Sequence, residues 1–145
     1  MSPDEFTAFL HRNIPLAGAM QLQVVDCGGG KIELQAPLAP NRNHRDTAFG
    51  GSLATLGIVS GWALLQQELQ HQGLDARIVI QRGECDFVEP VAAEFSASCN
   101  LPDAQWERFL ATLRRRGRAR ITLHSSLRCA GREAVRHSGT FVALN

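Results

Sequence analysis

The segment from Ser52 to Leu65 is apolar on almost every side, and no other feature of the sequence constrains the fold as strongly. Its large apolar side chains do not keep to one helical stripe, so a helix here must be enclosed by the rest of the protein. Gly57 and Gly61 lower its helical propensity, but they would let another element pack very close. We expect the polar stretch Gln66–Gln72 to emerge into solvent and to stop at Gly73. The apolar residues of the segment are Leu53, Leu56, Ile58, Val59, Trp62, Leu64 and Leu65.

Six other segments favour strands, most of them by the alternation of apolar and polar residues that is typical of half-buried strands. The first two are separated by three consecutive glycines and therefore predict a hairpin. The third contains Gly83, which would mark a β-bulge. The last two are joined by a turn at Ala130-Gly131. In chain order the six segments are Gln21–Cys27, Lys31–Ala36, Arg77–Phe87, Ala93–Leu101, Arg118–Arg128 and Arg132–Leu144.

Two amphipathic helices are predicted outside this core. Ser2 and Glu5 have the spacing of a capping box, and the helix that they begin should end near Asn13–Pro15, because proline disfavours helix at the residue before it. Asp103 can cap the second helix, which Gly117 ends after three arginines that suit the helix dipole. The apolar face of this second helix is formed by Trp106, Phe109, Leu110 and Leu113.

One enclosed helix and one antiparallel sheet predict an α+β protein in which the sheet wraps around a long central helix, with an N-terminal helix and one inserted helix. This is the hot-dog fold. With 145 residues, the chain should form a single hot-dog domain over residues 1–145. An open antiparallel sheet edge tends to pair, so we expect a homodimer, with higher assemblies also open.

Composition and charge argue against several classes of function. The formal net charge is +1, so no general attraction to nucleic acid or to a membrane surface is expected. No run approaches the roughly 18 apolar residues that cross a bilayer, and the N-terminus lacks the zones of a signal peptide. These features predict a soluble, cytoplasmic protein without membrane insertion. The four cysteines lie far apart and no nucleotide-binding motif is present, so we expect no disulfide framework, no metal and no cofactor.

A polar loop with two glycines leads into the enclosed helix, and it reads NRNHRDTAFGGSL over residues 41–53. The first turn of a helix has backbone N–H groups without partners, and the helix dipole favours negative charge beside them. The N–H groups of Gly50, Gly51 or Ser52 would therefore stabilise a thioester oxygen that becomes an oxyanion or enolate. A structural interpretation, in which the glycines form a tight entry into a core helix, stays open.

The stretch PLAPNRNHRDTAFGGSLATLGIVSGW resembles the loop and helix of the YiiD-type C-terminal domain family, a group of thioesterase-like proteins. The later stretches DFVEPVAAEFSASCNL, GRARITLHSSL and SGTFVAL resemble it too, so the similarity covers nearly the whole chain. The resemblance implies a hot-dog fold, a dimer, and substrates carried on acyl carrier protein or coenzyme A. It also implies decarboxylation of malonyl-acyl carrier protein to the acetyl primer of fatty acid synthesis, with the family's catalytic asparagine at Asn43.

Two reactions compete, and the residues bear on the choice. Hydrolysis needs a base to activate water, and related thioesterases carry an acidic residue about two turns into this helix, near Ile58 here. No Asp, Glu or His lies between Gly51 and Gln66, which favours decarboxylation. Asp46 could still act as a base from the loop or could be a turn residue, and His44 has the same two interpretations. A non-catalytic acyl-binding module is the third hypothesis.

The sequence has one notable basic cluster, around Arg116, Arg118 and Arg120. It could dock an acidic carrier protein or the phosphates of a pantetheine-bearing ligand. It could equally be the C-terminus of a helix that continues into a solvated strand face. Nucleic-acid binding is less favoured, because no aromatic side chains alternate with these arginines.

Overall fold

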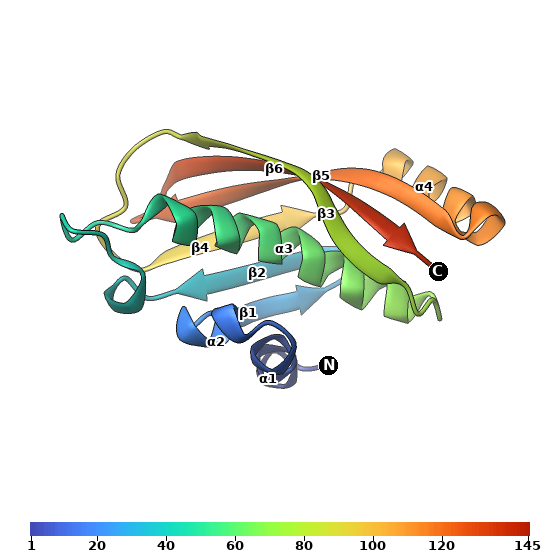
Figure 1. Cartoon of the computed structure of the whole chain (residues 1–145), viewed down its shortest axis with the longest axis horizontal. Coiled ribbons are helices and arrows are strands. Elements are labelled where there is room, and N and C mark those ends of the chain that lie inside the picture. Colours follow the sequence, from blue (N-terminus) through green and yellow to red (C-terminus); the bar gives the residue numbers. More distant parts are fainter.

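A six-stranded antiparallel sheet curves around one long helix, α3 (Gly50–His71), in the computed structural model, which describes residues 1–145 (Figure 1). The strand order is β1-β2-β4-β5-β6-β3, so the two edges are formed by β1 and β3. This arrangement confirms the predicted α+β hot-dog fold. The strands are β1 (Gln23–Gly28), β2 (Lys31–Ala36), β3 (Arg77–Phe87), β4 (Phe95–Asn100), β5 (Arg118–Cys129) and β6 (Arg132–Leu144).

Two glycines let α3 lie close to β6, as the sequence predicts. A Cβ atom on Gly57 would lie 2.6 Å from Cγ of His137. One on Gly61 would lie 2.6 Å from a ring carbon of Phe141. Since Gly57 and Gly61 are one helical turn apart, and His137 and Phe141 share one face of β6, the helix sits on the strand along two successive contacts.

The C-terminal part of α3 corrects one expectation. Gln67, Glu68 and Leu69 are buried, and the helix emerges into solvent only from Gln70 onward. The carboxylate of Glu68 accepts a hydrogen bond of 3.0 Å from the backbone N–H of Gly30 in the β1–β2 turn. This partner explains how a charged residue lies near the core.

The shorter helices surround this central unit. In α1 (Pro3–Asn13), the Ser2 hydroxyl accepts from the N–H of Glu5 at 3.2 Å, which confirms the predicted cap. The one-turn helices α2 (Pro15–Ala19) and η1 (Ala39–Asn41) were not expected from the sequence. Asp103 is the first residue of α4 (Asp103–Arg116) rather than its cap, which is Pro102. None of the helices combines the length and apolarity needed to span a membrane.

The two edges of the sheet differ. Helix α1 packs beside β1, and the Thr7 hydroxyl accepts a 2.9 Å hydrogen bond from the N–H of Val24. Strand β3 has no such cover, and its exposed apolar side chains include Val79 and Phe87. The irregularity in β3 lies between Ile80 and Arg82, and not at Gly83 as predicted. An uncovered strand of this length is a surface on which another strand can pair.

Replacing Gly57 by alanine should destabilise the protein by about 1–3 kcal/mol, because the new methyl group must displace either the His137 ring or the helix. Chemical denaturation measures this free energy of unfolding. Gly18→Ala is the matched control, since a Cβ there meets only ordinary contacts, the nearest at 3.8 Å on His11. Equal stability of the G57A variant and the wild type would contradict the close contact between α3 and β6.

Candidate active site

Asn41 fastens the loop that precedes α3. Its side-chain amide donates to the carbonyl oxygens of Met20 and Pro37 at 2.9 and 2.8 Å. Its own main-chain carbonyl accepts from the N–H of Phe49 at 2.7 Å, and the residue is 1% exposed. Asn41 therefore closes the loop at its base and ties it to the chain after α2.

Asn43 shapes the interior of the same loop. Its Oδ1 accepts from the N–H groups of Arg45 and Thr47 at 2.8 and 3.2 Å, and its Nδ2 donates to Oγ1 of Thr47 at 2.8 Å. A side-chain amide has two donor hydrogens and two acceptor positions. One N–H of Asn43 is therefore free to bind a ligand, while the rest of the amide holds the loop.

The first turn of α3 provides two free backbone donors. The N–H groups of Gly50 and Gly51 have no hydrogen-bond acceptor, and Phe49 at the cap position supplies none. The N–H of Ser52 donates to the carbonyl of Phe49 at 2.9 Å. The donors available to an anion are thus those of Gly50 and Gly51, and Ser52 is already satisfied.

The rings of Phe49 and Phe87 lie beside these donors. Both side chains are exposed, at 58% and 54%. The Phe87 ring would lie 3.7 Å from a Cβ on Gly50, and the Phe49 ring occupies the space that a Cβ on Gly51 would need. A Cβ on Gly51 would force the Phe49 ring to move, whereas a Cβ on Gly50 would make only an ordinary contact with Phe87. The two rings place apolar surface next to the two N–H groups.

Asp46 and His44 lie on the outer side of the loop. Asp46 adopts a left-handed conformation with φ 59°, and its carboxylate is 3.6 Å from the Arg42 guanidinium with 86% of the side chain exposed. His44 is exposed as well. This placement favours the interpretation of Asp46 as a turn residue, and a catalytic role for it stays a prediction without a supporting contact.

The sequence reasoning missed a buried histidine on β6. His137 is 3% exposed, and its imidazole ring makes no hydrogen bond to another protein group. Its cross-strand neighbours are Cys85 on β3 and Ser125 on β5, and it faces the second turn of α3 at Gly57. Burial lowers its pKa below the ordinary value of 6.5, so the ring is neutral at pH 7. The alternation along β6 would have revealed it, because position 137 falls on the inward face.

A second buried polar contact lies beside this histidine. The hydroxyl groups of Ser60 on α3 and Ser125 on β5 are 2.7 Å apart. Ser60 also donates to the carbonyl of Gly57 at 2.7 Å. No group of three or more His, Cys, Asp or Glu side chains is placed to hold a metal ion.

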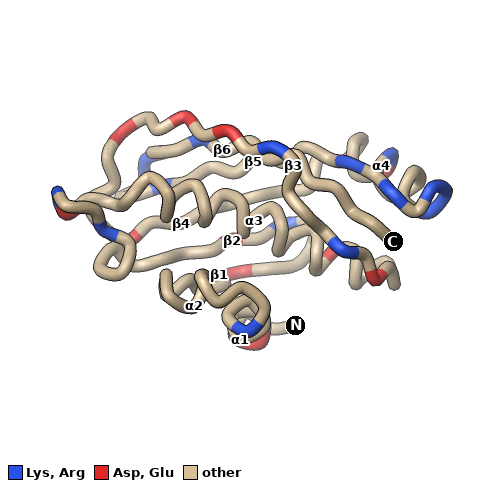
Figure 2. The backbone as a smooth tube through the Cα atoms, viewed as in Figure 1, with Lys and Arg blue, Asp and Glu red and all other residues tan.

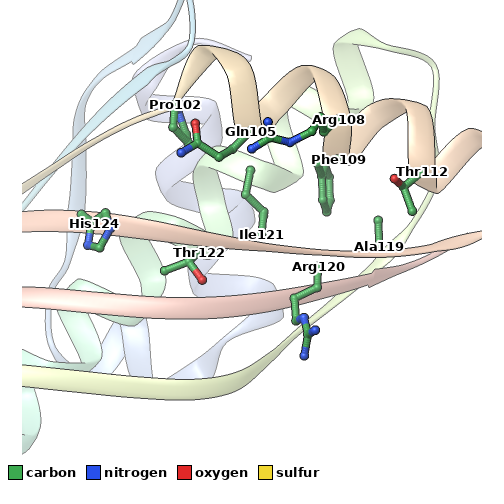
Figure 3. Close-up of a pocket in the computed structure, with 10 residues that line it drawn as sticks. All are labelled: Pro102, Gln105, Arg108, Phe109, Thr112, Ala119, Arg120, Ile121, Thr122 and His124. Atoms are coloured by element: carbon green, nitrogen blue, oxygen red, sulfur yellow. The ribbon is translucent and has the colours of Figure 1, made fainter.

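The arginines of the predicted docking cluster lie far from this loop. Arg116 ends α4, and Arg118 and Arg120 begin β5, at the end of the molecule opposite the first turn of α3 (Figure 2). They line a hollow of about 370 Å³, and none of them is in an ion pair. A neighbouring hollow of about 450 Å³ lies between α4 and β5, where Phe109 and Ile121 point toward each other and Arg120 points away from α4 (Figure 3).

An antiparallel sheet wrapped around a buried helix, with free donors at the first turn of that helix, defines a hot-dog-fold protein of the thioesterase superfamily. The chain belongs to the family YiiD_C, described as "Putative thioesterase (yiiD_Cterm)", which it matches over residues 3–145. The family and the fold thus agree over nearly the whole chain.

Solved structures share this architecture. A protein of unknown function from Chlorobaculum tepidum superposes with a TM-score of 0.93 at 25% identity, over 99% of this chain and 97% of the other. A "putative thioesterase" from Shewanella oneidensis gives 0.90 at 26% identity, with the same coverage. A protein of unknown function from Pseudomonas aeruginosa, described as "Probable Thioesterase", gives 0.84 at 19% identity over 98% and 95% of the two chains, and it supports the fold alone.

The buried His137 should make stability depend on pH. Its pKa is lowered in the folded state, so between that value and 6.5 the unfolded chain binds more protons than the folded one. Burial of the neutral ring therefore does not reduce the free energy of unfolding above about pH 6.5. It reduces this free energy increasingly as the pH falls below 6.5. Between pH 7.5 and pH 5.5, the free energy of unfolding measured in urea should fall less for H137Q than for the wild type. The exposed-site variant H44Q should lose as much as the wild type, and an unchanged loss in H137Q would contradict the assignment.

Proposed function

We propose that this protein decarboxylates malonyl groups held as thioesters of acyl carrier protein, releasing acetyl-acyl carrier protein for fatty acid synthesis. The observation that carries the proposal is the pair of free N–H groups at Gly50 and Gly51, beside the exposed rings of Phe49 and Phe87. No acidic residue or histidine from α3 accompanies this pair. The site therefore has donors that can stabilise an enolate oxygen, and α3 provides no base near them to activate water.

The chemistry requires little more than these donors. The bond between the α carbon and the carboxylate breaks, and CO₂ leaves. The electron pair of the broken bond moves into the thioester carbonyl to form an enolate. The N–H groups of Gly50 and Gly51 stabilise the enolate oxygen, and a proton from water then reaches the α carbon. The free N–H of Asn43 would hold the malonyl carboxylate out of the thioester plane, so that the breaking bond overlaps with the carbonyl.

Thioester hydrolysis, on acyl carrier protein or coenzyme A substrates, is the alternative. One observation favours it beyond the family description: His137 is neutral at pH 7 and faces the second turn of α3, where related enzymes are expected to carry an acid. The products separate the hypotheses. Malonyl-carrier protein gives acetyl-carrier protein by decarboxylation and a free carrier thiol by hydrolysis. A non-catalytic acyl-binding module gives neither product.

Substitutions at Asn43 test the proposed site. Asn43→Asp keeps both acceptor positions, so the bonds from Arg45 and Thr47 and the loop itself should persist. It removes the free N–H and adds a charge that repels the malonyl carboxylate. We expect acetyl-carrier formation, followed by mass spectrometry, to fall about 100-fold or more, because the malonyl carboxylate is no longer held in the reactive orientation.

The Asn43→Ala variant separates chemistry from loop shape, since it loses the loop bonds as well. It should lose turnover completely and should unfold at a slightly lower temperature than N43D, with the fold intact. An N43D variant that retained activity within a few-fold of the wild type would contradict the role given to the amide.

We propose further that two copies pair through β3, the uncovered edge of the sheet. Charges along this strand are segregated: Arg77 and Arg82 precede Gly83, and Glu84 and Asp86 follow it. Antiparallel pairing of β3 with itself, centred on Gly83, sets Arg82 opposite the partner's Glu84 and the reverse. The exposed apolar side chains of β3 would be covered at the same time.

A charge exchange tests this pairing. The single variant R82E sets like charges opposite each other at two symmetric positions, and should raise the dimer dissociation constant about tenfold. The double variant R82E/E84R restores opposite charges and should recover the dimer. Sedimentation equilibrium measures both constants. Equal dissociation constants for R82E and R82E/E84R would speak against a centre at Gly83.

A further inference from the structure

We infer that the carrier protein docks on the arginines of one subunit and delivers its thioester to the loop of the other subunit. The inference rests on the proposed function and on the dimer paired through β3. It gives Arg116, Arg118 and Arg120 a defined place relative to the chemistry, which a single chain does not provide.

The arginine surface fits an acidic protein partner. Arg116, Arg118 and Arg120 are exposed and have no carboxylate partner. Arg108 lines the neighbouring hollow together with Arg120 and is in no ion pair either. No carboxylate lines either hollow. Four arginines without an ion pair on one surface attract a protein with a negative face.

Within one chain this surface is too far from the loop. Arg118 shares a cross-strand position with Leu144, which pairs with Arg77 at the start of β3. The loop lies at the other end of β3, where the Phe87 ring lies beside Gly50. Ten residues of strand separate Arg77 from Phe87, about 33 Å at roughly 3.3 Å per residue. A carrier docked on these arginines would have to pass its arm along the whole strand.

In the dimer the distance becomes short. Antiparallel pairing centred on Gly83 brings the partner's Arg77 close to residues 87–89 of the first subunit. The partner's Arg118 is at the same level, two strands further across its sheet. Three strand spacings of about 4.8 Å then separate it from residue 89, just after Phe87, about 14 Å in all. An extended phosphopantetheine arm can bridge this gap.

Charge also distinguishes the two surfaces. The end of the chain that carries the loop contains Glu84, Asp86 and Glu89 on or just after β3, whereas the α4 end is basic (Figure 2). Two of these carboxylates are in exposed ion pairs, Glu84 with Arg82 and Glu89 with Arg132. At the loop end β3 therefore presents carboxylates, and the one loop arginine without an ion pair is Arg45, whereas the partner subunit supplies a larger basic surface.

Heterodimers with one substitution set in each chain test the inference. One chain carries N43D and the other R116E/R118E, with different tags for tandem purification. Delivery between subunits leaves one complete site, which combines the loop of the second chain with the arginines of the first. We expect about half of the wild-type kcat/KM for malonyl-carrier protein, against background for each parent homodimer. Activity at the parental level would overturn the inference.

The reverse combination gives the opposite result. When N43D, R116E and R118E are all in one chain with a wild-type partner, delivery between subunits predicts activity at the parental level. Delivery within one subunit predicts half of the wild-type activity, which would also overturn the inference. R12E/K31E is the matched control for R116E/R118E, because it reverses two exposed charges at the far edge of the sheet. When R12E/K31E replaces R116E/R118E in the two heterodimers, both should have about half of the wild-type activity.

A trapping experiment tests docking without relying on turnover. A carrier protein whose arm ends in a thiol-reactive group would label a cysteine introduced as S52C, with the wild-type dimer as background. A chain with S52C and R116E/R118E should be labelled at the full rate beside a wild-type partner. Labelling slowed fivefold or more would overturn the inference. An enzyme that labels as expected but gives no acetyl product would contradict only the proposed reaction.

Discussion

The close contact of α3 with the sheet is the constraint on which the rest of the structure depends. A helix that is apolar on all sides must be enclosed, and a single sheet can enclose it only by curving around it. Gly57 and Gly61 allow the helix to approach β6 closely, and the indole N–H of Trp62 donates to the carbonyl of Ile78 on β3 at 3.0 Å. These contacts fix the direction of α3 and so hold its first turn beside the end of β3, where Phe87 lies.

Much of this could be predicted from the sequence, because alternation and helical periodicity reflect burial along one segment. Contacts between distant segments could not. Glu68 lies near the core because its partner, the N–H of Gly30, is 38 residues away, and no local pattern contains that pairing. The irregularity in β3 lies next to Gln81 rather than at Gly83, since the neighbouring strand decides which residue is extra. His137 lies on the inward face of β6, which the alternation along the strand indicates, but its position opposite Gly57 depends on how α3 packs on the sheet.

The loop shows why a motif does not by itself assign a role to each residue. Asn41 and Asn43 belong to one N-x-N pattern. Asn41 is buried, and both of its amide hydrogens are donated to the carbonyl oxygens of Met20 and Pro37. Asn43 keeps one N–H free. Ser52 belongs to the same glycine-rich turn, but its N–H is used by Phe49. The hydrogen bonds of the folded structure therefore distinguish between candidate site residues that the sequence treats as equivalent.

One dimer arrangement accounts for both the exposed edge strand β3 and the distance between the arginines and the loop. Strand β3 leaves backbone groups and apolar side chains exposed at one edge, and the arginines lie at the end of the sheet remote from the loop. A two-fold axis through β3 covers the edge and, because it reverses the strand direction, carries the basic end of one subunit to the loop end of the other. Segregated charge along β3 favours this antiparallel orientation, since a parallel pairing would set like charges opposite each other. The same symmetry would therefore place the partner's arginines near each loop.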